Sequence, residues 1–265
     1  MMQLLAQWLA RLPGYLWSGW GAIASLLLGL AAWEALAALY GPLVLPTPLQ
    51  AAHSLRALAA EGGPLWAELA VTARRALIGL ALAVGAGSLL GVAAGSFATA
   101  ALLARPWVTV LMGTPPIAWL VLAMLWFGAG DGTPVFTVFI ACFPVVFASA
   151  LQGARTLDAH WRELAQGYGL RWRDRVWDVY LPHVLSYLFP AWVVALGSAW
   201  RVVVMAELLS SSTGVGAALA ASRAQLDMPA TLAWIGAVVL LLLALEYLVL
   251  EPIKREIERW REPAP

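Results

Sequence analysis

Six long apolar runs constrain this chain more than any other feature of its sequence. Each holds about 20 mainly apolar residues, the length that an α-helix needs to cross the hydrocarbon core of a bilayer. They lie at residues 19–40, 76–95, 107–127, 134–152, 184–205 and 231–250. The composition agrees, because 62% of the residues are hydrophobic and 12% are charged, whereas about 25% are charged in a typical soluble domain. We predict an all-α, polytopic membrane protein with about six transmembrane helices.

The composition also argues against several other classes of protein. Cys142 is the only cysteine, which excludes an internal disulfide and a cysteine-rich metal site. The three histidines, His53, His160 and His183, are scattered, so we expect no metal site. The formal net charge of +1 gives no electrostatic reason to expect nucleic acid as a partner. Residues 1–17 have neither a basic start nor a small-residue cleavage site, so we interpret them as an amphipathic lead-in rather than a cleaved signal peptide.

The basic residues predict how the spans are oriented. Six spans place both termini on the same side of the membrane. Basic residues at 155–175 and 254–261 would share that side, which the positive-inside rule assigns to the cytoplasm. We therefore predict that both termini are cytoplasmic. Arg74 and Arg75 would lie on the outer side, next to the second span, and do not fit the rule.

Prolines and glycines predict local departures from straight, independent helices. The stretches "GTPPIAW" in the third run and "CFPVV" in the fourth contain prolines, which predict kinks because proline removes a helical hydrogen bond. Gly87, Gly91 and Gly95 recur every four residues on one face of the second run, which favours close packing against another helix.

Two connecting segments have a predicted form of their own. Residues 41–72 read as an extended stretch followed by an amphipathic helix on the outer face. Residues 206–229 read as a loop with a short helix or a re-entrant turn. No domain boundary is visible, so we predict a single transmembrane domain over 1–265, with a cytoplasmic loop at 155–182 and a cytoplasmic tail at 251–265.

A polar, arginine- and tryptophan-rich stretch, "ELAQGYGLRWRDRVWDVYLP" at 163–182, separates the fourth and fifth runs. Its pattern resembles the EAA loop of ABC importer permeases: E-A-A, three residues, G, nine residues, I, one residue, L-P. The matching positions are Glu163, Ala165, Gly169, Val179, Leu181 and Pro182. Leu164 replaces the first alanine, and Val179 replaces the isoleucine. The position of the loop between the fourth and fifth spans is also that of the family.

The resemblance extends over most of the chain. The stretches "PPIAWLVLAMLWFGAGDGTPVF", "FPVVFASALQGARTLD", "WRVVVMAELLSSSTGVGAAL" and "YLVLEPIKREIERWR" look like the branch of the binding-protein-dependent (MetI-like) permeases that serves nitrate, taurine, alkanesulfonates, bicarbonate and some pyrimidine precursors. The resemblance implies the transmembrane domain of a type I ABC importer. It also implies a location in the bacterial inner membrane and a small, anionic solute.

The resemblance further implies a set of partners. The working unit would contain two copies of this chain and two ABC ATPase subunits, and an extracytoplasmic binding protein would deliver the substrate. This chain would have no catalytic residues and would bind no cofactor, because ATP and Mg²⁺ would be used by the ATPase.

The chemistry of the loop fits a role in coupling. A short helix docked in a groove of the ATPase can transmit a rigid-body motion. Glu163 would cap or pair with a basic group of the partner, and Ala165 would allow close approach. Gly169 would permit a sharp turn, since glycine tolerates φ > 0. Leu181 and Pro182 would anchor the start of the fifth span.

The arginines of this region have two interpretations. They could contact the ATPase, or they could set the topology as cytoplasmic charges near anionic lipid. These residues are Arg162, Arg171, Arg173 and Arg175.

Candidate residues of a translocation path lie mainly in the fifth run. Arg201 could attract an anion, because ionisable residues in spans are functional candidates. Alternatively, Arg201 pairs with Glu207 or extends to the outer interface. Trp119 and Trp200 could line the path or belong to interfacial belts of tryptophan.

Other functions remain open at this stage. The solute could be neutral or cationic, such as a pyrimidine precursor. An ion-coupled secondary transporter would require inverted repeats and paired carboxylates near the bilayer midplane; Glu34 and Glu246 are intramembrane acids without a partner identifiable from the sequence. A membrane enzyme would need a polar constellation, for which His183 and Ser186 are the nearest pair.

Overall fold

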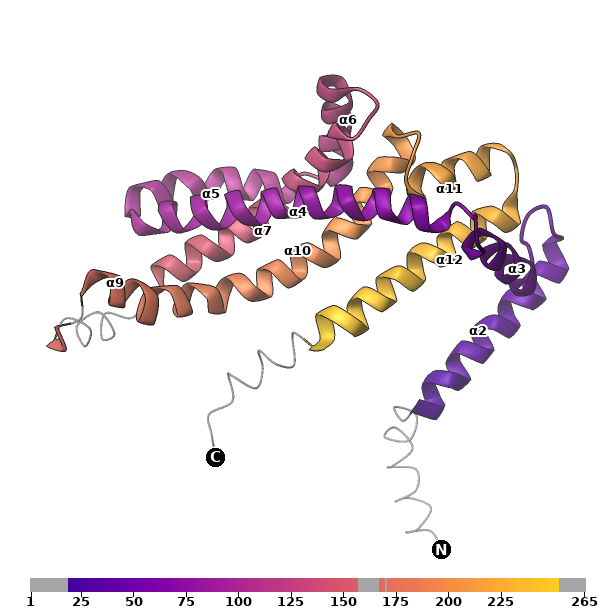
Figure 1. The fold of residues 1–265 in the computed structure, drawn as a ribbon, viewed down its shortest axis with the longest axis horizontal. Helices are drawn as coiled ribbons and strands as arrows, with labels where there is room; N and C mark the ends of the chain where they lie inside the picture. The colour runs from indigo at the N-terminus through magenta and orange to yellow at the C-terminus, as the bar shows by residue number, and fades with distance from the viewer. Residues whose placement is uncertain (1–18, 157–166, 170, 253–265) are drawn as a thin grey trace, which may run out of the picture.

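The computed structural model describes residues 19–156, 167–169 and 171–252, and every regular element in these ranges is a helix (Figure 1). The elements are, in order, α2 (Gly19–Tyr40), α3 (Pro48–Ala59), α4 (Leu65–Ser96), α5 (Ala98–Gly113), α6 (Pro116–Phe127), α7 (Gly132–Arg155), α9 (Trp172–Arg175), η1 (Val176–Tyr180), α10 (Leu181–Ser210), α11 (Val215–Ala224), α12 (Met228–Leu245) and η2 (Glu246–Leu250). The all-α prediction is confirmed for the part of the chain that the structure describes.

The number of spans also agrees with the sequence. Within the described ranges, five helices are long and apolar enough to cross a membrane, and the bent pair of α5 and α6 makes a sixth. The second span is longer than predicted, because α4 begins at Leu65 rather than at residue 76. Nothing between Leu65 and residue 76 interrupts a helix, since the glycines and proline at 62–64 all precede it.

The third span is not a single rod. The prediction of one span over 107–127 is wrong in its bounds, because α5 starts at Ala98 and meets α6 at an angle of 93°. Pro115 and Pro116 explain the break, since neither ring nitrogen can donate a helical hydrogen bond. Pro144, in contrast, lies inside α7, which runs from Gly132 to Arg155 without interruption.

The core is formed by α4, α7 and α10, with the largest contact between α4 and α7. Gly87, Gly91 and Gly95 are buried on the face of α4 that meets α7. A Cβ atom at Gly91 would lie 2.5 Å from the carbonyl oxygen of Phe147, and one at Gly95 would lie 2.7 Å from that of Leu151. The two helix backbones approach so closely that only glycine fits at these positions.

The remaining helices define two opposite ends of the molecule. One end, called here the α11 end, contains α3, α11 and the start of α4 (Figure 1). The other end, called the α9 end, contains α9 and the end of α7. The short helices predicted within 41–72 and 206–229 are present as α3 and α11. A capping box between Thr47 and Gln50 fixes the start of α3.

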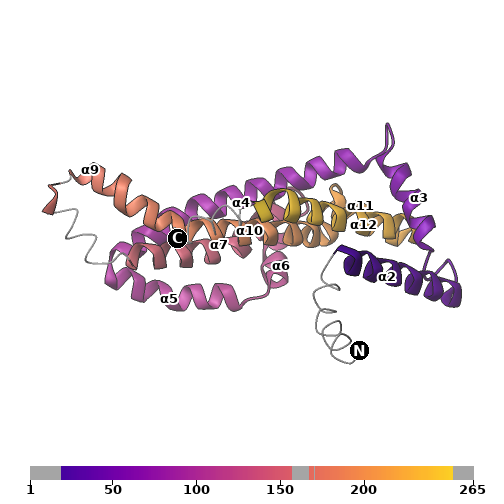
Figure 2. The same cartoon turned by 90° about the horizontal axis from the view of Figure 1, so that it is seen from below.

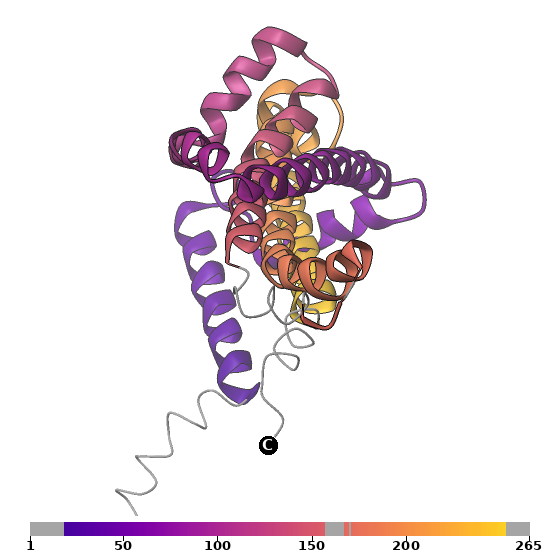
Figure 3. The ribbon, with the colours of Figure 1, turned by 90° about the vertical axis from the view of Figure 1, so that its left-hand side faces the viewer.

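The first described helix, α2, stands beside the core rather than within it (Figures 2 and 3). Most of its side chains are exposed, including Glu34. It is tied to the following loop by the indole N–H of Trp33, which donates to the carbonyl oxygen of Pro46 at 2.9 Å.

Candidate functional site

The EAA-like loop is only partly described. Glu163 and Ala165 lie outside the described residues. Gly169 is exposed and has φ of +67°, the left-handed conformation that the sequence predicted for a sharp turn. Side chains other than glycine rarely adopt this conformation.

The end of the loop is continuous with the fifth span. Val179 lies in η1, a single π-helical turn, and η1 leads directly into α10 at Leu181. Pro182 is the second residue of α10, and because the helix already runs through η1, its missing N–H leaves one helical hydrogen bond unmade directly after the π-helical turn. Residues Trp172–Ser210 therefore form one continuous helical rod from the loop into the core.

A cavity lies beside the base of this rod, between the ends of α4 and α7 and the start of α10. Its volume is about 550 Å³, and its lining includes Ser96, Arg155 and Tyr180. Arg171 and Arg173 are exposed at the same end, a position that fits both contact with a partner and interaction with anionic lipid.

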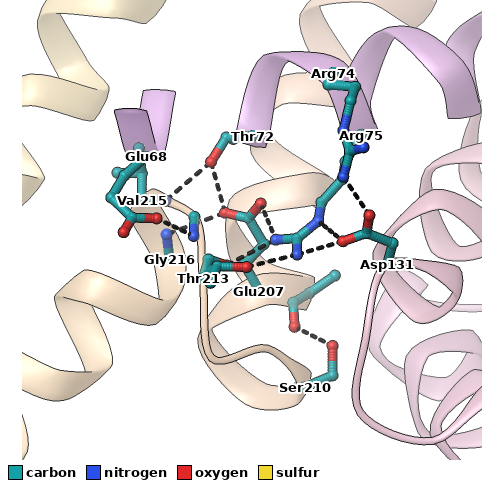
Figure 4. A network of polar contacts seen from close by, with 12 residues as sticks. Glu68, Thr72, Arg74, Arg75, Asp131, Glu207, Ser210, Thr213, Val215 and Gly216 are labelled. Atoms are coloured by element: carbon teal, nitrogen blue, oxygen red, sulfur yellow. Dashed lines mark hydrogen bonds and ion pairs between the residues drawn. The ribbon is translucent and has the colours of Figure 1, made fainter. Parts of the chain in front are cut away.

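The most extensive polar cluster in the described chain lies at the α11 end, around Arg75 (Figure 4). Arg75 is 2% exposed. Its Nε and Nη2 donate to Oδ1 of Asp131 at 2.8 and 2.6 Å, and Nη1 donates to Oε1 of Glu207 at 2.8 Å. Nη1 and Nη2 also donate to the carbonyl and hydroxyl oxygens of Thr213 at 2.7 and 2.9 Å. These bonds use all the donor capacity of the guanidinium group.

Glu207 is the second buried charge of the cluster and is 0% exposed. Besides the bond from Arg75, its Oε2 accepts from Thr72 Oγ1 at 2.8 Å and from the backbone N–H of Gly216 at 3.1 Å. Thr72 Oγ1 in turn accepts from the backbone N–H of Val215 at 2.9 Å. The carboxylate thus fixes the start of α11 against α4 and α10.

Asp131 and Glu68 extend the cluster towards solvent. Arg74 forms an ion pair with Asp131, and Glu68 accepts from the backbone N–H of Gly214. The hydrogen bond from Arg75 lowers the pKa of Asp131 from its usual value, and the positive charges of Arg75 and Arg74 act in the same direction. Asp131 therefore stays ionised to more acidic pH than a free aspartate.

This cluster explains the arginine pair that did not fit the orientation rule. Arg75 is neutralised inside the protein, so it does not face lipid. The alternative that Arg201 pairs with Glu207 is wrong, because the partner of Glu207 is Arg75. Glu207 was also a candidate for the path, but its carboxylate is fully buried and does not line an open path in this structure. The arginine pair bordering the second predicted span was the signal for such a cluster, since a charge at the edge of a span favours a counter-charge.

Arg201 has a different environment. It is exposed on α10 and lines a groove of about 420 Å³ between α10 and α12. The other lining residues are Gly197, Val239, Leu242, Leu243, Leu245 and Glu246. Arg201 forms no ion pair and no side-chain hydrogen bond within the described residues.

The two candidate tryptophans do not line this groove. Trp200 is 8% exposed and belongs to the core, and Trp119 is half-buried on α6. The indole N–H groups of both are buried and have no hydrogen-bond partner within the described ranges.

The pair considered for an enzyme does not form a catalytic arrangement. Ser186 Oγ donates to the carbonyl oxygen of His183 at 2.7 Å, not to its ring. The His183 ring Nε2 lies 3.3 Å from Oγ1 of Thr156. The Ser186 hydroxyl is therefore not activated by the His183 ring as a catalytic nucleophile would be.

Comparison with known proteins identifies the family. Residues 83–258 match the model of the family described as "binding-protein-dependent transport system inner membrane component". The chain is 29% identical to the taurine transport system permease protein TauC of Escherichia coli (strain K12), over 90% of this chain and 89% of that protein. It is 26% identical to the nitrate import permease protein NrtB of Synechococcus elongatus, over 71% and 70%.

One further relative and two solved structures are also similar to this chain. The chain is 31% identical to the putative aliphatic sulfonates transport permease protein SsuC of Bacillus subtilis (strain 168), over 65% of this chain and 62% of that protein. The fold is similar to a chain of the MetNI methionine ABC transporter, with a TM-score of 0.53 and 19% identity over 74% of this chain and 93% of that chain. It is also similar to an amino acid ABC transporter, with a TM-score of 0.50 and 15% identity over 74% and 92%. The chain belongs to the family of binding-protein-dependent transport system inner membrane components, and is thus a multi-pass permease and not an enzyme.

Proposed function

We propose that this chain is the membrane permease of an ABC importer for a small oxyanion, of the nitrate or sulfonate type. The observation that carries the proposal is the chemistry shared by the substrates for which the relatives are named. Taurine, aliphatic sulfonates and nitrate all present a compact, negatively charged group of oxygen atoms. A neutral or cationic solute, such as a pyrimidine precursor, is the competing possibility.

We also propose that a separate ATPase drives the permease through the EAA-like loop. Glu163, Ala165 and Gly169 would form the contact, and two ATPase subunits would bind ATP and Mg²⁺. The continuous rod formed by Trp172–Ser210 supports this route. A force applied at the α9 end would be transmitted to the core along this helix, because no loop interrupts it between Trp172 and Ser210.

The orientation follows from the same proposal. The α9 end, both termini, the loop at 155–182 and the tail at 251–265 would face the cytoplasm of a bacterium. The α11 end would face outwards and receive solute from the binding protein. A second copy of this chain would complete the path, and 1–265 would form one transmembrane domain.

Reconstitution in proteoliposomes tests this function. The chain would be co-purified with its ATPase, and the binding protein would be supplied from outside with radiolabelled taurine or nitrate. We expect uptake that requires internal ATP and is abolished by a non-hydrolysable analogue. Uptake that is independent of ATP and is driven by an ion gradient would overturn the ABC assignment. ATP-driven uptake of a neutral solute, with neither oxyanion transported, would overturn the substrate class.

A further inference from the structure

Arg75 and Arg201 both lie within membrane-spanning helices, but only one of them is neutralised. Arg75 is held by Glu207, Asp131 and Thr213. Arg201 is exposed to a groove and forms no ion pair within the described ranges. A charge at membrane depth is costly unless a counter-charge or water accompanies it. The same helix bundle thus contains one structural arginine and one that forms no ion pair within the described residues.

The groove around Arg201 is suited to a small anion. Gly197 lies one helical turn before Arg201 on the same face of α10, so no side chain fills the space beside the guanidinium. The facing wall on α12 is apolar and includes Val239 and Leu242. An apolar wall lowers the local dielectric constant and strengthens attraction between the guanidinium and an anion. The volume of about 420 Å³ lies in the range of small-molecule sites, about 300–1,000 Å³.

Arg201 is the one basic residue among the residues that line the groove. A site with one attracting charge binds weakly, as a transit site must, because a solute held tightly would not leave.

We propose that Arg201 is the residue that recognises the oxyanion group of the solute in the membrane path. This inference rests on the proposed function, because it assumes that the chain transports an anion. Planar guanidinium groups bind the oxygen atoms of oxyanions through paired hydrogen bonds. Arg201 therefore selects for negatively charged solutes after the binding protein has released them.

The first experiment compares the Arg201→Gln, Arg201→Lys and Arg105→Gln variants in the proteoliposome assay. Arg105 is the matched control, since it is an exposed arginine on another span and does not line the groove. We expect Arg201→Gln to reduce ATP-driven oxyanion uptake at least tenfold, Arg201→Lys to retain part of it, and Arg105→Gln to behave as wild type. Binding-protein-stimulated ATP hydrolysis and assembly with the ATPase should be unchanged in all three.

The outcomes separate this inference from the proposed function. If the wild type fails to take up either oxyanion, the proposed function fails. If the wild type and Arg201→Gln transport the oxyanion equally, only the role of Arg201 fails. Loss of assembly in both Arg201→Gln and Arg201→Lys would show a structural role and would also overturn the inference.

A second experiment needs neither transport nor the binding protein. Val239→Cys, in a Cys142→Ala background, places a thiol in the groove. Its rates of reaction with an anionic and a cationic methanethiosulfonate reagent are then compared. We expect Arg201→Gln to lower the anionic-to-cationic rate ratio several-fold. An unchanged ratio would contradict the role assigned to Arg201.

Discussion

The guanidinium of Arg75 and the carboxylate of Glu207 form a buried ion pair in which Nη1 and Oε1 lie 2.8 Å apart. Arg75 lies on α4 and Glu207 near the end of α10. The pair therefore connects two of the three core helices at the α11 end. Through Asp131 and Thr213 it also holds the α6–α7 turn and the loop that precedes α11. These four segments are expected to move as one unit.

Removing one partner of this pair should destabilise the protein strongly. Glu207→Gln removes one of the two carboxylates that compensate the buried charge of Arg75, and Arg75→Met leaves the Glu207 carboxylate buried without a counter-charge. We expect each single change to cost about 3–5 kcal/mol. Thermal unfolding of the purified protein in detergent measures the effect.

The double variant Arg75→Met/Glu207→Met provides the control. It removes both charges, so its loss of stability should be smaller than the sum of the two single losses. Additive losses would show that the two side chains act independently, contrary to the geometry.

The stability of the α11 end should depend on pH through Asp131. Contacts with Arg75 lower the pKa of Asp131 in the folded protein. A lowered pKa contributes stability that is present above the unfolded pKa and is lost as pH falls through the folded value. The loss should therefore develop below about pH 4. The difference in melting temperature between wild type and Asp131→Asn should shrink over this range, and a constant difference would refute the assignment.

The glycine seam between α4 and α7 predicts a position-dependent effect of alanine. A Cβ at Gly91 would lie 2.6 Å from Cβ of Ala150, whereas one at Gly85 on the same helix would meet nothing within 4 Å. We expect Gly91→Ala to destabilise by about 1–3 kcal/mol through overpacking. Gly85→Ala should be neutral or stabilising by up to about 1 kcal/mol, because alanine favours helices. Melting temperatures of both variants, measured in detergent, test this prediction. Equal effects at Gly91 and Gly85 would contradict the close contact between α4 and α7.

The turn at Gly169 predicts a loss of coupling. Its φ of +67° is a strong outlier for a β-branched residue. We expect Gly169→Val to insert and fold but to lose ATPase binding and solute uptake. Gly167→Val is the matched control, because Gly167 has open space around it and no positive φ. Normal uptake by Gly169→Val, or an equal loss in both variants, would contradict the predicted role of the turn.

The sequence predicted the spans because their signal is local. Runs of apolar residues and the paired prolines at 115–116 can be recognised without knowledge of the rest of the chain. The bend of 93° between α5 and α6 could not be predicted, since a proline break fixes the position of a bend but not its angle.

The ion-pair cluster was missed because its members are distant in sequence. Arg75 and Glu207 each have a local explanation in the sequence, as an exception to the orientation rule and as a path residue. Their hydrogen bonds join residues separated by 56 and 132 positions. Only the packing of α4 against α7 and α10 brings these side chains together.

Co-purification tests the central claim, that this chain is an ABC permease coupled to an ATPase through its loop, most directly. The chain is tagged, extracted from its native membrane in mild detergent, and its associated proteins are identified and quantified. We predict an ATPase in equal amount, retained by wild type and by Arg105→Gln but lost from Glu163→Lys. A homo-oligomer without an ATPase that still moves solute along an ion gradient would contradict the account.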